Sequence, residues 1–419
     1  MSRRMKDSGI PWLKAIPEQW NVERGKNVLL LRKRPVREDD EVITCFRDGE
    51  VVLRSERRTD GFTMSDKEIG YQGINKGDIV IHGMDGFAGA MGVSKSTGKG
   101  SPVLIVCSPK YDAIPEYVVY YLRSLAMTNV FVALATGIRE RSCDLRWNKI
   151  SELEFILPPS EEQQRIADFL DQKCSEIDEI VALQEQIIEE LKAYKQAIIT
   201  EAVCKGLNPD AEMKPSGVEW IDEIPTGWGV KMLGSLLYEH KQKNTGLIEN
   251  NLLSLSYGRI IRKDINTNGG LLPMSFEGYN IIGKNDIVLR MTDLQNDHKS
   301  LRTGLCNETG IITSAYITLR PKTQLNSKYI HYLLHTYDVL KVFYGMGDGV
   351  RQSIGFDDIR KLLIFIPSAK EQDEICNYLD QKCAEIDSLV AIKQQKIEEL
   401  KDYKKSIIYE YITGKKEII

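Results

Sequence analysis

Two short stretches of the 419-residue sequence contain residue types that could do chemistry. Residues 92–100 are rich in glycine and lysine, as phosphate-binding loops are, but five residues rather than four separate Gly92 from Gly98, and Gly100 replaces the hydroxyl residue that binds magnesium. Residues 209–214 contain the letters of a metal-dependent nuclease, yet their carboxylates lie within one short linker, whereas a shared metal needs ligands on separate rigid elements. We interpret the first stretch as a flexible basic loop and the second as a chance match.

Two histidines are the remaining candidates for metal chemistry. His331 and His335 stand four residues apart on a predicted helix, which is a spacing for two metal ligands, but no acidic residue lies between them and no third ligand suggests itself. A pair on the helix surface is the simpler interpretation. No dinucleotide fingerprint, amino-methyltransferase motif, Ser/His/Asp set or Cys/His pair is visible in the sequence. We therefore expect a chain without catalytic residues, metal or cofactor of its own.

Composition and charge are those of a folded protein with two or three domains, at 42% hydrophobic and 28% charged residues. The apolar runs are too short to span a bilayer and the polar amino terminus does not resemble a signal peptide, which favours a cytoplasmic protein. Eight scattered cysteines without a C-x-x-C pair indicate reduced thiols. The net charge is +3 over residues 1–158, −6 over 159–207, +1 over 208–366 and −2 over 367–419. The mildly basic parts permit DNA binding without demonstrating it.

An internal repeat at an offset near 209 organises the chain. Both copies open on an Ile-Pro-x-x-Trp pattern and later share two helical segments, whereas the residues between agree much less. The matching segments are 6–12 with 214–220, 16–22 with 224–230, 171–178 with 380–387, and 188–195 with 397–404. A matching frame with a divergent middle predicts two modules that do the same task on different targets.

The second part of each copy has the heptad pattern of a coiled coil. Gly206 and Gly414 are the predicted helix stops, and two such helices in one chain can pack on each other in antiparallel orientation. The predicted seam consists of Leu170, Ile177, Val181, Ile188, Leu191, Ile198, Leu379, Ile386, Val390, Ile397, Leu400 and Ile407. We expect a mixed α/β (α+β) architecture: a module over 1–158, a long helix over 159–207, a second module over 208–366 and a second long helix over 367–419.

Basic residues in the two modules are the candidate ligands of DNA. Arginine can bind the major-groove edge of guanine through two hydrogen bonds, and both cations neutralise phosphates. The candidates are Arg54, Arg57, Arg58, Lys95, Lys99, Arg139, Arg141 and Arg146 in the first module, and Arg259, Arg262, Lys263, Arg290, Lys299, Arg302 and Arg351 in the second. The glycines at 83, 86, 89 and 92 either allow close approach of a phosphate or only build turns.

Taken together, the chain resembles the specificity subunits of type I restriction-modification systems along essentially its whole length. The resemblance rests on the tandem Ile-Pro-x-x-Trp openings, the Glu-Gln pairs that follow Pro158 and Pro367, and the two heptad helices. Further matches are the segment 76–80 and the Gly-x-Arg turns at 137–139 and 349–351, whereas Asn285 departs from the pattern at the position of Gly77. It implies that each module is a target recognition domain for one half of a split, asymmetric double-stranded DNA site. It also implies that the helices form an antiparallel spacer that docks two modification subunits.

Those partners would bind S-adenosylmethionine and methylate adenine at N6, and motor-nuclease subunits would add ATP- and Mg-dependent cleavage. The seam from Leu170 to Ala202 is about 48 Å long at 1.5 Å per residue, which suits half-sites one to one and a half turns of DNA apart. An alternative from another class is a coiled-coil scaffold that presents two protein-binding modules. A stand-alone nuclease or methyltransferase is disfavoured by the missing motifs.

Overall fold

The computed structural model describes residues 3–57, 69–134, 145–265, 273, 275–294, 297, 301–346 and 354–418. Its contacts divide the chain into two units, Met1–Glu185 with Gln394–Ile419 (unit 1) and Gln186–Lys393 (unit 2). Each unit contains one module together with parts of both long helices, α6 (Ser160–Lys205) and α10 (Ala369–Ile412). The four predicted segments give each long helix a segment of its own, whereas the contacts divide both helices between the units.

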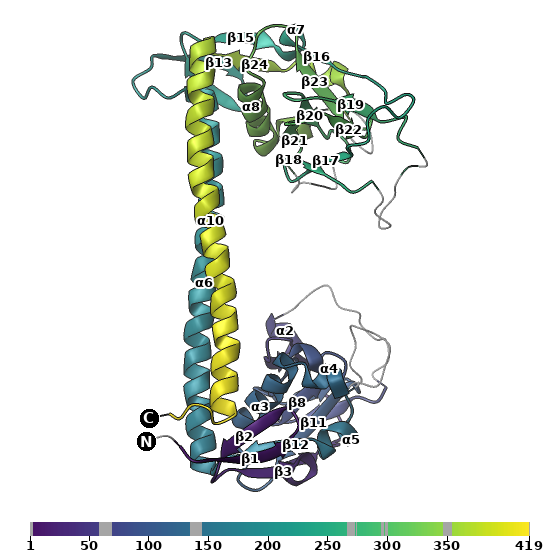
Figure 1. Cartoon of the computed structure of the whole chain (residues 1–419), viewed down its shortest axis with the longest axis vertical. Helices are drawn as coiled ribbons and strands as arrows, with labels where there is room; N and C mark the ends of the chain where they lie inside the picture. Colours follow the sequence, from purple (N-terminus) through teal and green to yellow (C-terminus); the bar gives the residue numbers. More distant parts are fainter. Residues whose placement is uncertain are drawn as a thin grey trace. The chain divides into compact units, whose positions relative to one another are not determined.

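The module of unit 1 is built on a four-stranded antiparallel sheet in the order β4-β11-β8-β9. Figure 1 labels its two central strands, β11 and β8. Its strands are β4 (Leu29–Leu31), β11 (Leu104–Pro109), β8 (Ile79–His82) and β9 (Met91–Val93). Antiparallel pairs surround it: β1 (Met5–Ile10) with β2 (Leu13–Pro17), β3 (Asn21–Arg24) with β12 (Glu154–Leu157), β5 (Ile43–Cys45) with β6 (Val51–Leu53), and β7 (Gln72–Ile74) with β10 (Gly98–Gly100). The helices are α1 (Gly25–Val28), α2 (Arg54–Arg57), η1 (Gly86–Ala88), α3 (Pro115–Met127), α4 (Val130–Leu134) and α5 (Trp147–Glu152).

The module of unit 2 repeats this topology strand for strand, with the central order β16-β23-β20-β21. The sheet contains β16 (Leu237–Glu239), β23 (Ile317–Pro321), β20 (Ile287–Leu289) and β21 (Thr303–Leu305). The pairs are β13 (Met213–Val218) with β14 (Ile221–Pro225), β15 (Gly229–Met232) with β24 (Leu363–Ile366), β17 (Leu253–Ser256) with β18 (Arg259–Arg262), and β19 (Asn280–Ile282) with β22 (Gly310–Ile312). The helices are α7 (Leu233–Leu236), α8 (Ser327–Val339), η2 (Val342–Gly345) and α9 (Phe356–Ile359).

Each central sheet separates two hydrophobic cores, which explains its uninterrupted apolar strands. In β8, Ile79 and Ile81 face the core that includes α3 and the long helices, while Val80 faces a smaller core under the β5–β6 hairpin. In β20, Ile287 and Leu289 face the larger core of unit 2, and Val288 faces the smaller one under β17–β18. Every second side chain therefore packs on the opposite face.

The long helices pack antiparallel within each unit, as predicted. In unit 1, Leu170 and Ile177 from the first half of α6 share a core with Ile407 and Ile412 from the end of α10. Unit 2 combines the end of α6 with the beginning of α10 in the same way. Eight predicted seam residues are buried, and Val181, Leu191, Val390 and Leu400 are half-buried. The mixed α/β fold with two modules and two long packed helices is thus confirmed.

Candidate nucleic-acid interface

A tryptophan in unit 1 holds the start of one long helix and the end of the other. Trp20 is fully buried, and its Nε1–H donates to Oε2 of Glu162, in the first turn of α6, at 3.0 Å. Gly414 follows α10 with a left-handed φ of 71°, and a Cβ added to it would lie 2.4 Å from Cγ of Pro17 and 3.1 Å from the Trp20 ring. The Ile-Pro-x-x-Trp motif therefore positions two helix ends.

The second copy of the motif makes the same connection in unit 2. Trp228 Nε1–H donates to Oε1 of Glu371 at 3.0 Å, in the first turn of α10. Gly206 ends α6 with φ 74°, and its added Cβ would lie 3.3 Å from the Trp228 ring and 3.8 Å from Pro225. Each module thus holds the start of one helix and the end of the other, an arrangement that requires antiparallel helices.

The glutamine of each Glu-Gln pair joins a long helix to the helix of its module. The buried side chain of Gln163 accepts the backbone N–H of Ile114, at the N-cap of α3, at 2.9 Å and donates to the carbonyl of Pro158 at 2.9 Å. Gln372 makes the equivalent two hydrogen bonds in unit 2. The two carbonyl bonds are buried and the two N–H bonds are partly buried, so the repeated glutamine supplies partners to backbone groups that water reaches poorly.

Two lysines that interrupt the predicted seam form ion pairs between the helices. Lys404 Nζ lies 2.6 and 2.7 Å from the carboxylate oxygens of Asp178 in unit 1. Lys195 lies 2.7 Å from both carboxylate oxygens of Asp387 in unit 2. Both lysine side chains are less than a quarter exposed, at 21% and 24%. Polar seam positions of this kind favour one register over others.

A buried aspartate precedes the equivalent central strand of each module and forms an ion pair with an arginine. The sequence analysis did not identify these ion pairs. Asp78 is 4% exposed and bonds the Arg34 guanidinium, with one contact of 3.1 Å. Asp286 is 1% exposed and accepts two hydrogen bonds of 2.7 Å from Arg320. The repeated Asp-Ile-Val sequence marked both aspartates. Their arginine partners, Arg34 after β4 and Arg320 in β23, lie 44 and 34 residues away along the chain, too far for sequence reasoning to find.

The backbone conformation of the residue before each aspartate explains why glycine in the first copy can be asparagine in the second. Gly77 and Asn285 both have left-handed backbones, with φ values of 86° and 71°. Asparagine is one of the few residues other than glycine that adopts this conformation readily. The replacement of Gly77 by Asn285 therefore keeps the turn that precedes β20.

The described DNA-binding candidates of the first module gather mainly around the β5–β6 hairpin. Arg57 donates to Asp48 and Glu50, the latter at 3.0 Å, and Lys95 lies 3.1 Å from Glu50. The bond from Arg57 holds the pKa of the Asp48 carboxyl below its usual value. Of the other candidates, Arg54 follows β6, Lys99 lies in β10 and Arg146 precedes α5. Arg58, Arg139 and Arg141 lie outside the described residues.

Three described candidates of the second module lie on one hairpin. Arg259 and Arg262 are the ends of β18, and Lys263 follows it. Arg262 Nε lies 2.9 and 2.8 Å from the Glu308 carboxylate, and this contact lowers the pKa of Glu308. Arg290 has a longer ion pair, of 3.5 Å, with Asp297. Lys299 and Arg351 lie outside the described residues.

Arg302 was predicted to bind DNA, and the structure shows that this is wrong. Its side chain is fully buried, at 0% exposure. Nε donates to the Tyr344 hydroxyl at 3.0 Å, and the two Nη groups donate to four backbone carbonyls, those of residues 290, 292, 293 and 297. The N–H donors of this guanidinium therefore supply hydrogen bonds to backbone carbonyls and a tyrosine hydroxyl inside the module. Sequence reasoning could not separate this arginine from an exposed one.

The repeated glycines build turns and close packing within the module. A Cβ on Gly92 would lie 1.9 Å from the carbonyl oxygen of Gly49, and one on Gly83 would lie 2.9 Å from that of Leu145. Gly89 has a φ of 90°. Residues 94–97 form a short turn between β9 and β10 instead of a loop that opens a helix, so this stretch is not a phosphate-binding loop.

The histidine pair lies against α6 rather than on a free helix surface, so the surface interpretation is wrong. His335 Nε2 lies 2.9 Å from Gln196 Oε1, and His331 Nε2 is buried without a hydrogen-bond partner among the described residues. Burial lowers the pKa of His331 to about 3 and that of His335 to about 4. Both are therefore neutral near pH 7. No cluster of three His, Cys, Asp or Glu side chains that could hold a metal occurs in the described parts of the chain.

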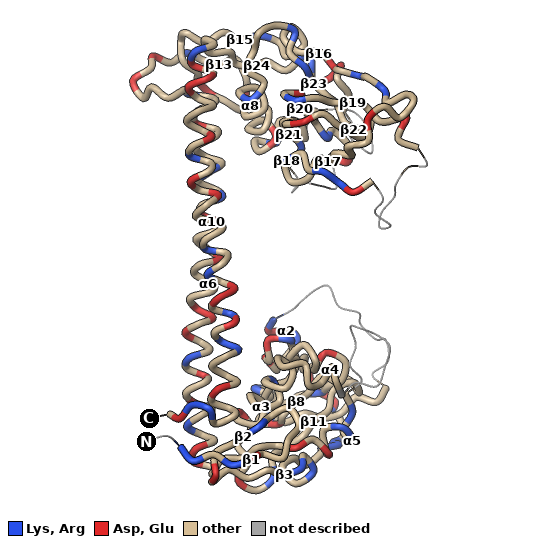
Figure 2. Tube along the Cα trace, in the orientation of Figure 1, with Lys and Arg blue, Asp and Glu red and all other residues tan. Residues whose placement is uncertain are grey.

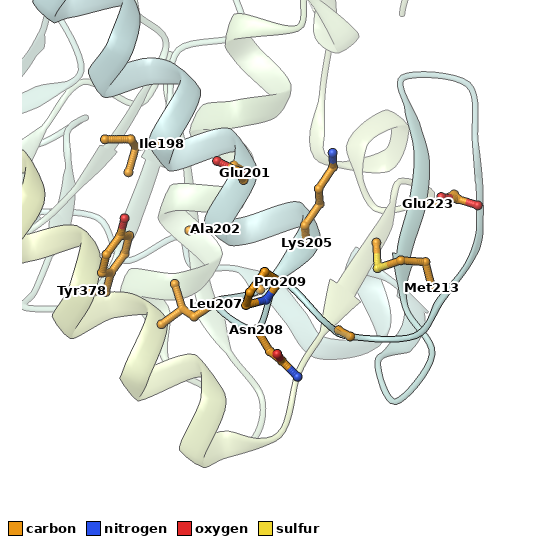
Figure 3. Close-up of a pocket in the computed structure, with 12 residues that line it drawn as sticks. Ile198, Glu201, Ala202, Lys205, Leu207, Asn208, Pro209, Met213, Glu223 and Tyr378 are labelled. Atoms are coloured by element: carbon orange, nitrogen blue, oxygen red, sulfur yellow. The ribbon is translucent and has the colours of Figure 1, made fainter.

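The nuclease-like stretch folds as a linker beside the end of α6. Figure 3 shows Pro209 and Met213 at a pocket of about 640 Å³ that also contains Glu201 and Lys205 from α6. The backbone N–H of Asp210 donates to the Asn208 side chain at 3.1 Å, as in an Asx turn. Lys214 Nζ donates to the carbonyls of residues 226 and 228 at 2.8 and 2.6 Å. This lysine therefore supports β13–β14, as the chance interpretation requires.

Comparison with known proteins identifies the family. A family model described as the type I restriction modification DNA specificity domain matches residues 39–193 and 252–402. A curated protein of Methanocaldococcus jannaschii, provisionally named as the type I restriction enzyme MjaX specificity subunit, is 25% identical over 360 residues, 84% of this chain and 76% of its own.

Solved structures share the fold. A chain from a study of complex assembly and conformational transition in the type I R-M system has a TM-score of 0.70 at 17% identity, covering 95% of this chain and 99% of its own. The HsdS subunit from Thermoanaerobacter tengcongensis has a TM-score of 0.52 at 17% identity, covering 95% and 98%. None of the helices among the described residues is long and apolar enough to cross a membrane. The chain belongs to the type I restriction-modification DNA specificity family, as a specificity subunit with two tandem recognition domains for DNA sequence.

Proposed function

We propose that the two modules read the two halves of a bipartite, asymmetric DNA site. The observation that carries this proposal is a contrast within each module. The shared parts, which we call the frame, are alike in the two modules, whereas the hairpin turns differ. The modules share their topology, tryptophan contacts and buried aspartates, but the turn at 46–50 in the first corresponds to a two-residue turn, Tyr257-Gly258, in the second. Equal frames with unequal exposed turns suit two readers of different sequences.

The long helices set the number of base pairs between the half-sites. Removal of one heptad from both α6 and α10, in register, shortens the packed helices by about 10 Å, at 1.5 Å per residue. The spacer then decreases by about three base pairs at 3.4 Å each, and the two half-sites stay the same. An unchanged spacer in an active complex contradicts this role for the helices.

The helices also dock two copies of one modification subunit. Each unit presents one set of exposed apolar side chains on its helices, and the members of the two sets are 209 residues apart. Leu183 and Ile392, a repeat-related pair, are 57% and 58% exposed. The two sets are Ile180, Leu183 and Tyr403 in unit 1, and Leu389, Ile392 and Tyr194 in unit 2. Exposed aromatic and aliphatic groups favour a protein interface.

Single charge substitutions test the docking. Leu183→Glu or Ile392→Glu reduces the number of bound modification subunits from two to one per chain, as measured by native mass spectrometry, and the double variant binds none. Leu247→Glu is the control, because Leu247 is similarly exposed, at 56%, and lies in the second module. Two bound subunits on the double variant contradict the assignment.

The chemistry belongs to the partner subunits. They bind S-adenosylmethionine and transfer its methyl group to N6 of adenine, and motor-nuclease subunits use ATP and Mg for cleavage where they are present. The absence of a catalytic motif from this sequence supports such a division. Purified chain alone is expected to leave DNA unmodified, and methylation by the isolated chain contradicts it.

The decisive experiment is co-expression of the chain with its neighbouring modification subunit, followed by single-molecule sequencing of methylated adenines across a genome. Two fixed half-motifs with a constant spacer are expected. A methylating complex that shows no bipartite motif overturns the proposal. Binding that weakens steeply with salt separates a DNA reader from the protein-binding scaffold, because phosphate contacts release counterions.

A further inference from the structure

The β17–β18 hairpin of the second module has one covered face and one open face. Its register pairs Leu255 with Ile260 and Ser254 with Ile261, so that side chains alternate between the faces. Leu253, Leu255 and Ile260 pack in the smaller core of the module. The opposite face presents Ser254, Ser256, Arg259 and Ile261. Of these, Arg259 has a side chain that is 74% exposed, and Ile261 is 41% exposed.

The tip of this hairpin has an unusual residue. Tyr257 and Gly258 form its two-residue turn, and both have left-handed backbones, with φ values of 45° and 76°. Such turns favour Asn-Gly, and a tyrosine in this conformation is strained. The Tyr257 side chain does not compensate through burial, because the residue is 80% exposed. A strained, exposed aromatic residue at a hairpin tip suggests that it is retained for contact with a partner.

We propose that this open face enters the major groove of the half-site read by the second module, with Arg259 and Ile261 on base edges and Tyr257 at the leading tip. The inference rests on the proposed function and adds the residues that read the sequence. The groove admits a two-stranded β-ribbon. Arginine reads guanine, serine hydroxyls accept or donate to base edges, and an apolar side chain contacts the thymine methyl group.

The charges around the hairpin favour DNA over a protein partner. Arg259 on the open face, Arg262 at the end of β18 and Lys263 after it make the second strand of the hairpin basic. Figure 2 shows Lys and Arg in blue near β17 and β18. Among the described residues, Arg259 forms an ion pair of 3.5 Å with Asp387. Exposed pairs of this kind are weak, so a guanine or a phosphate can replace the aspartate.

The corresponding hairpin of the first module does not offer the same surface. Val52 and Thr44 form the outward pair of β5–β6, but Val52 is only 6% exposed and the Thr44 hydroxyl is bonded by Arg54 Nε at 3.3 Å. The open face is therefore specific to the second module, and changes in it should affect one half of the recognition site.

Tyr257→Asn in the assembled complex gives two effects of opposite sign. Asparagine relieves the strained turn, and so raises the melting temperature of the chain by roughly 2–4 °C. It also removes the proposed aromatic contact. Binding of duplex DNA that contains the recognition site found by methylome sequencing therefore becomes weaker. The matched control is Tyr111→Asn in the first module, where the tyrosine is 94% exposed with a φ of 52°. We expect this control to leave DNA affinity unchanged.

Arg259→Ala and Ile261→Ser complete the test. We expect Arg259→Ala to weaken binding at the second half-site roughly 10- to 100-fold, the range for loss of a bidentate base contact. Methylome sequencing should then show relaxed bases in that half only. If the wild-type complex gives a bipartite motif and all three variants keep its affinity and both half-motifs, the hairpin assignment fails while the proposed function stands. If the wild-type complex methylates without a bipartite motif, the proposed function itself fails.

Discussion

The conservative substitution Arg302→Lys separates a structural arginine from a DNA contact. Lysine keeps the positive charge, so a phosphate contact would survive, but it has three donors on one atom in place of a planar five-donor fork. Arg302 makes bonds to four carbonyls and one hydroxyl. A lysine can make at most three of these five bonds, so at least two are lost in the variant, while the Tyr344 hydroxyl keeps its own 3.2 Å bond to the carbonyl of Asp297.

The expected destabilisation follows from that count. A hydrogen bond that involves a charged group contributes about 1.5–3 kcal/mol, so the loss of two such bonds costs about 3–6 kcal/mol. One kcal/mol lowers the melting temperature of a body of 150–250 residues by about 2–4 °C, and we therefore expect the second unit to melt at least about 6 °C lower. Differential scanning calorimetry of the full chain measures this shift.

Arg290→Lys is the matched control for this experiment. Arg290 lies on the same loop, but its side chain is 29% exposed and has a 3.5 Å pair with Asp297. A change below about 1 kcal/mol is expected there. If Arg302→Lys melts with the wild type and instead weakens DNA binding, the structural role assigned to Arg302 is refuted.

Two further predictions concern helix ends and pH. In thermal unfolding, Gly414→Ala should destabilise unit 1 more than Gly206→Ala destabilises unit 2. The added Cβ at position 414 lies 2.4 Å from Pro17, whereas the added Cβ at position 206 lies 3.1 Å from a side-chain oxygen of Glu371. Equal losses of stability argue against the packing explanation. The depressed pKa values of His331 and His335 give stability that is present above pH 6.5 and lost as the pH falls toward 4, by about 1.4 kcal/mol per pH unit for each histidine. Asp338, whose pKa burial raises to about 6, opposes this slope below pH 6, and urea titrations of His335→Gln should show a smaller acid loss than the wild type.

The repeated frame could be predicted from the sequence because its residues act through backbone geometry and core packing. Trp20, Gly414 and the heptad side chains occupy positions that tolerate few alternatives, so duplication kept them recognisable. The same constraint made the antiparallel helices predictable. The Gln163 contacts were not predictable in detail, but the repetition of this residue marked its position.

The residues that we propose as DNA contacts could not be predicted in the same way, because an arginine looks the same in sequence whether it is buried or exposed. Arg302 and Arg259 were both candidates, yet one is 0% exposed and the other has a side chain 74% exposed. The open face of β17–β18 also depends on a strand register that no local motif encodes. Tyr257 carried a usable signal, since a Tyr-Gly pair between two alternating runs predicts a hairpin turn with an unfavourable first residue.

Because the hairpin face is exposed and the contacts of the frame are buried, substitutions in the two parts should differ in their effect on stability. Substitutions on the open face of β17–β18 leave the buried contacts of Trp228 and Asp286 untouched, and exposed substitutions usually change stability by less than about 0.5 kcal/mol. The hairpin can therefore change its sequence while the module keeps its hold on both helices. If the proposed reading is right, we expect substitutions in the hairpin to change the half-site that the second module reads while the fold stays the same.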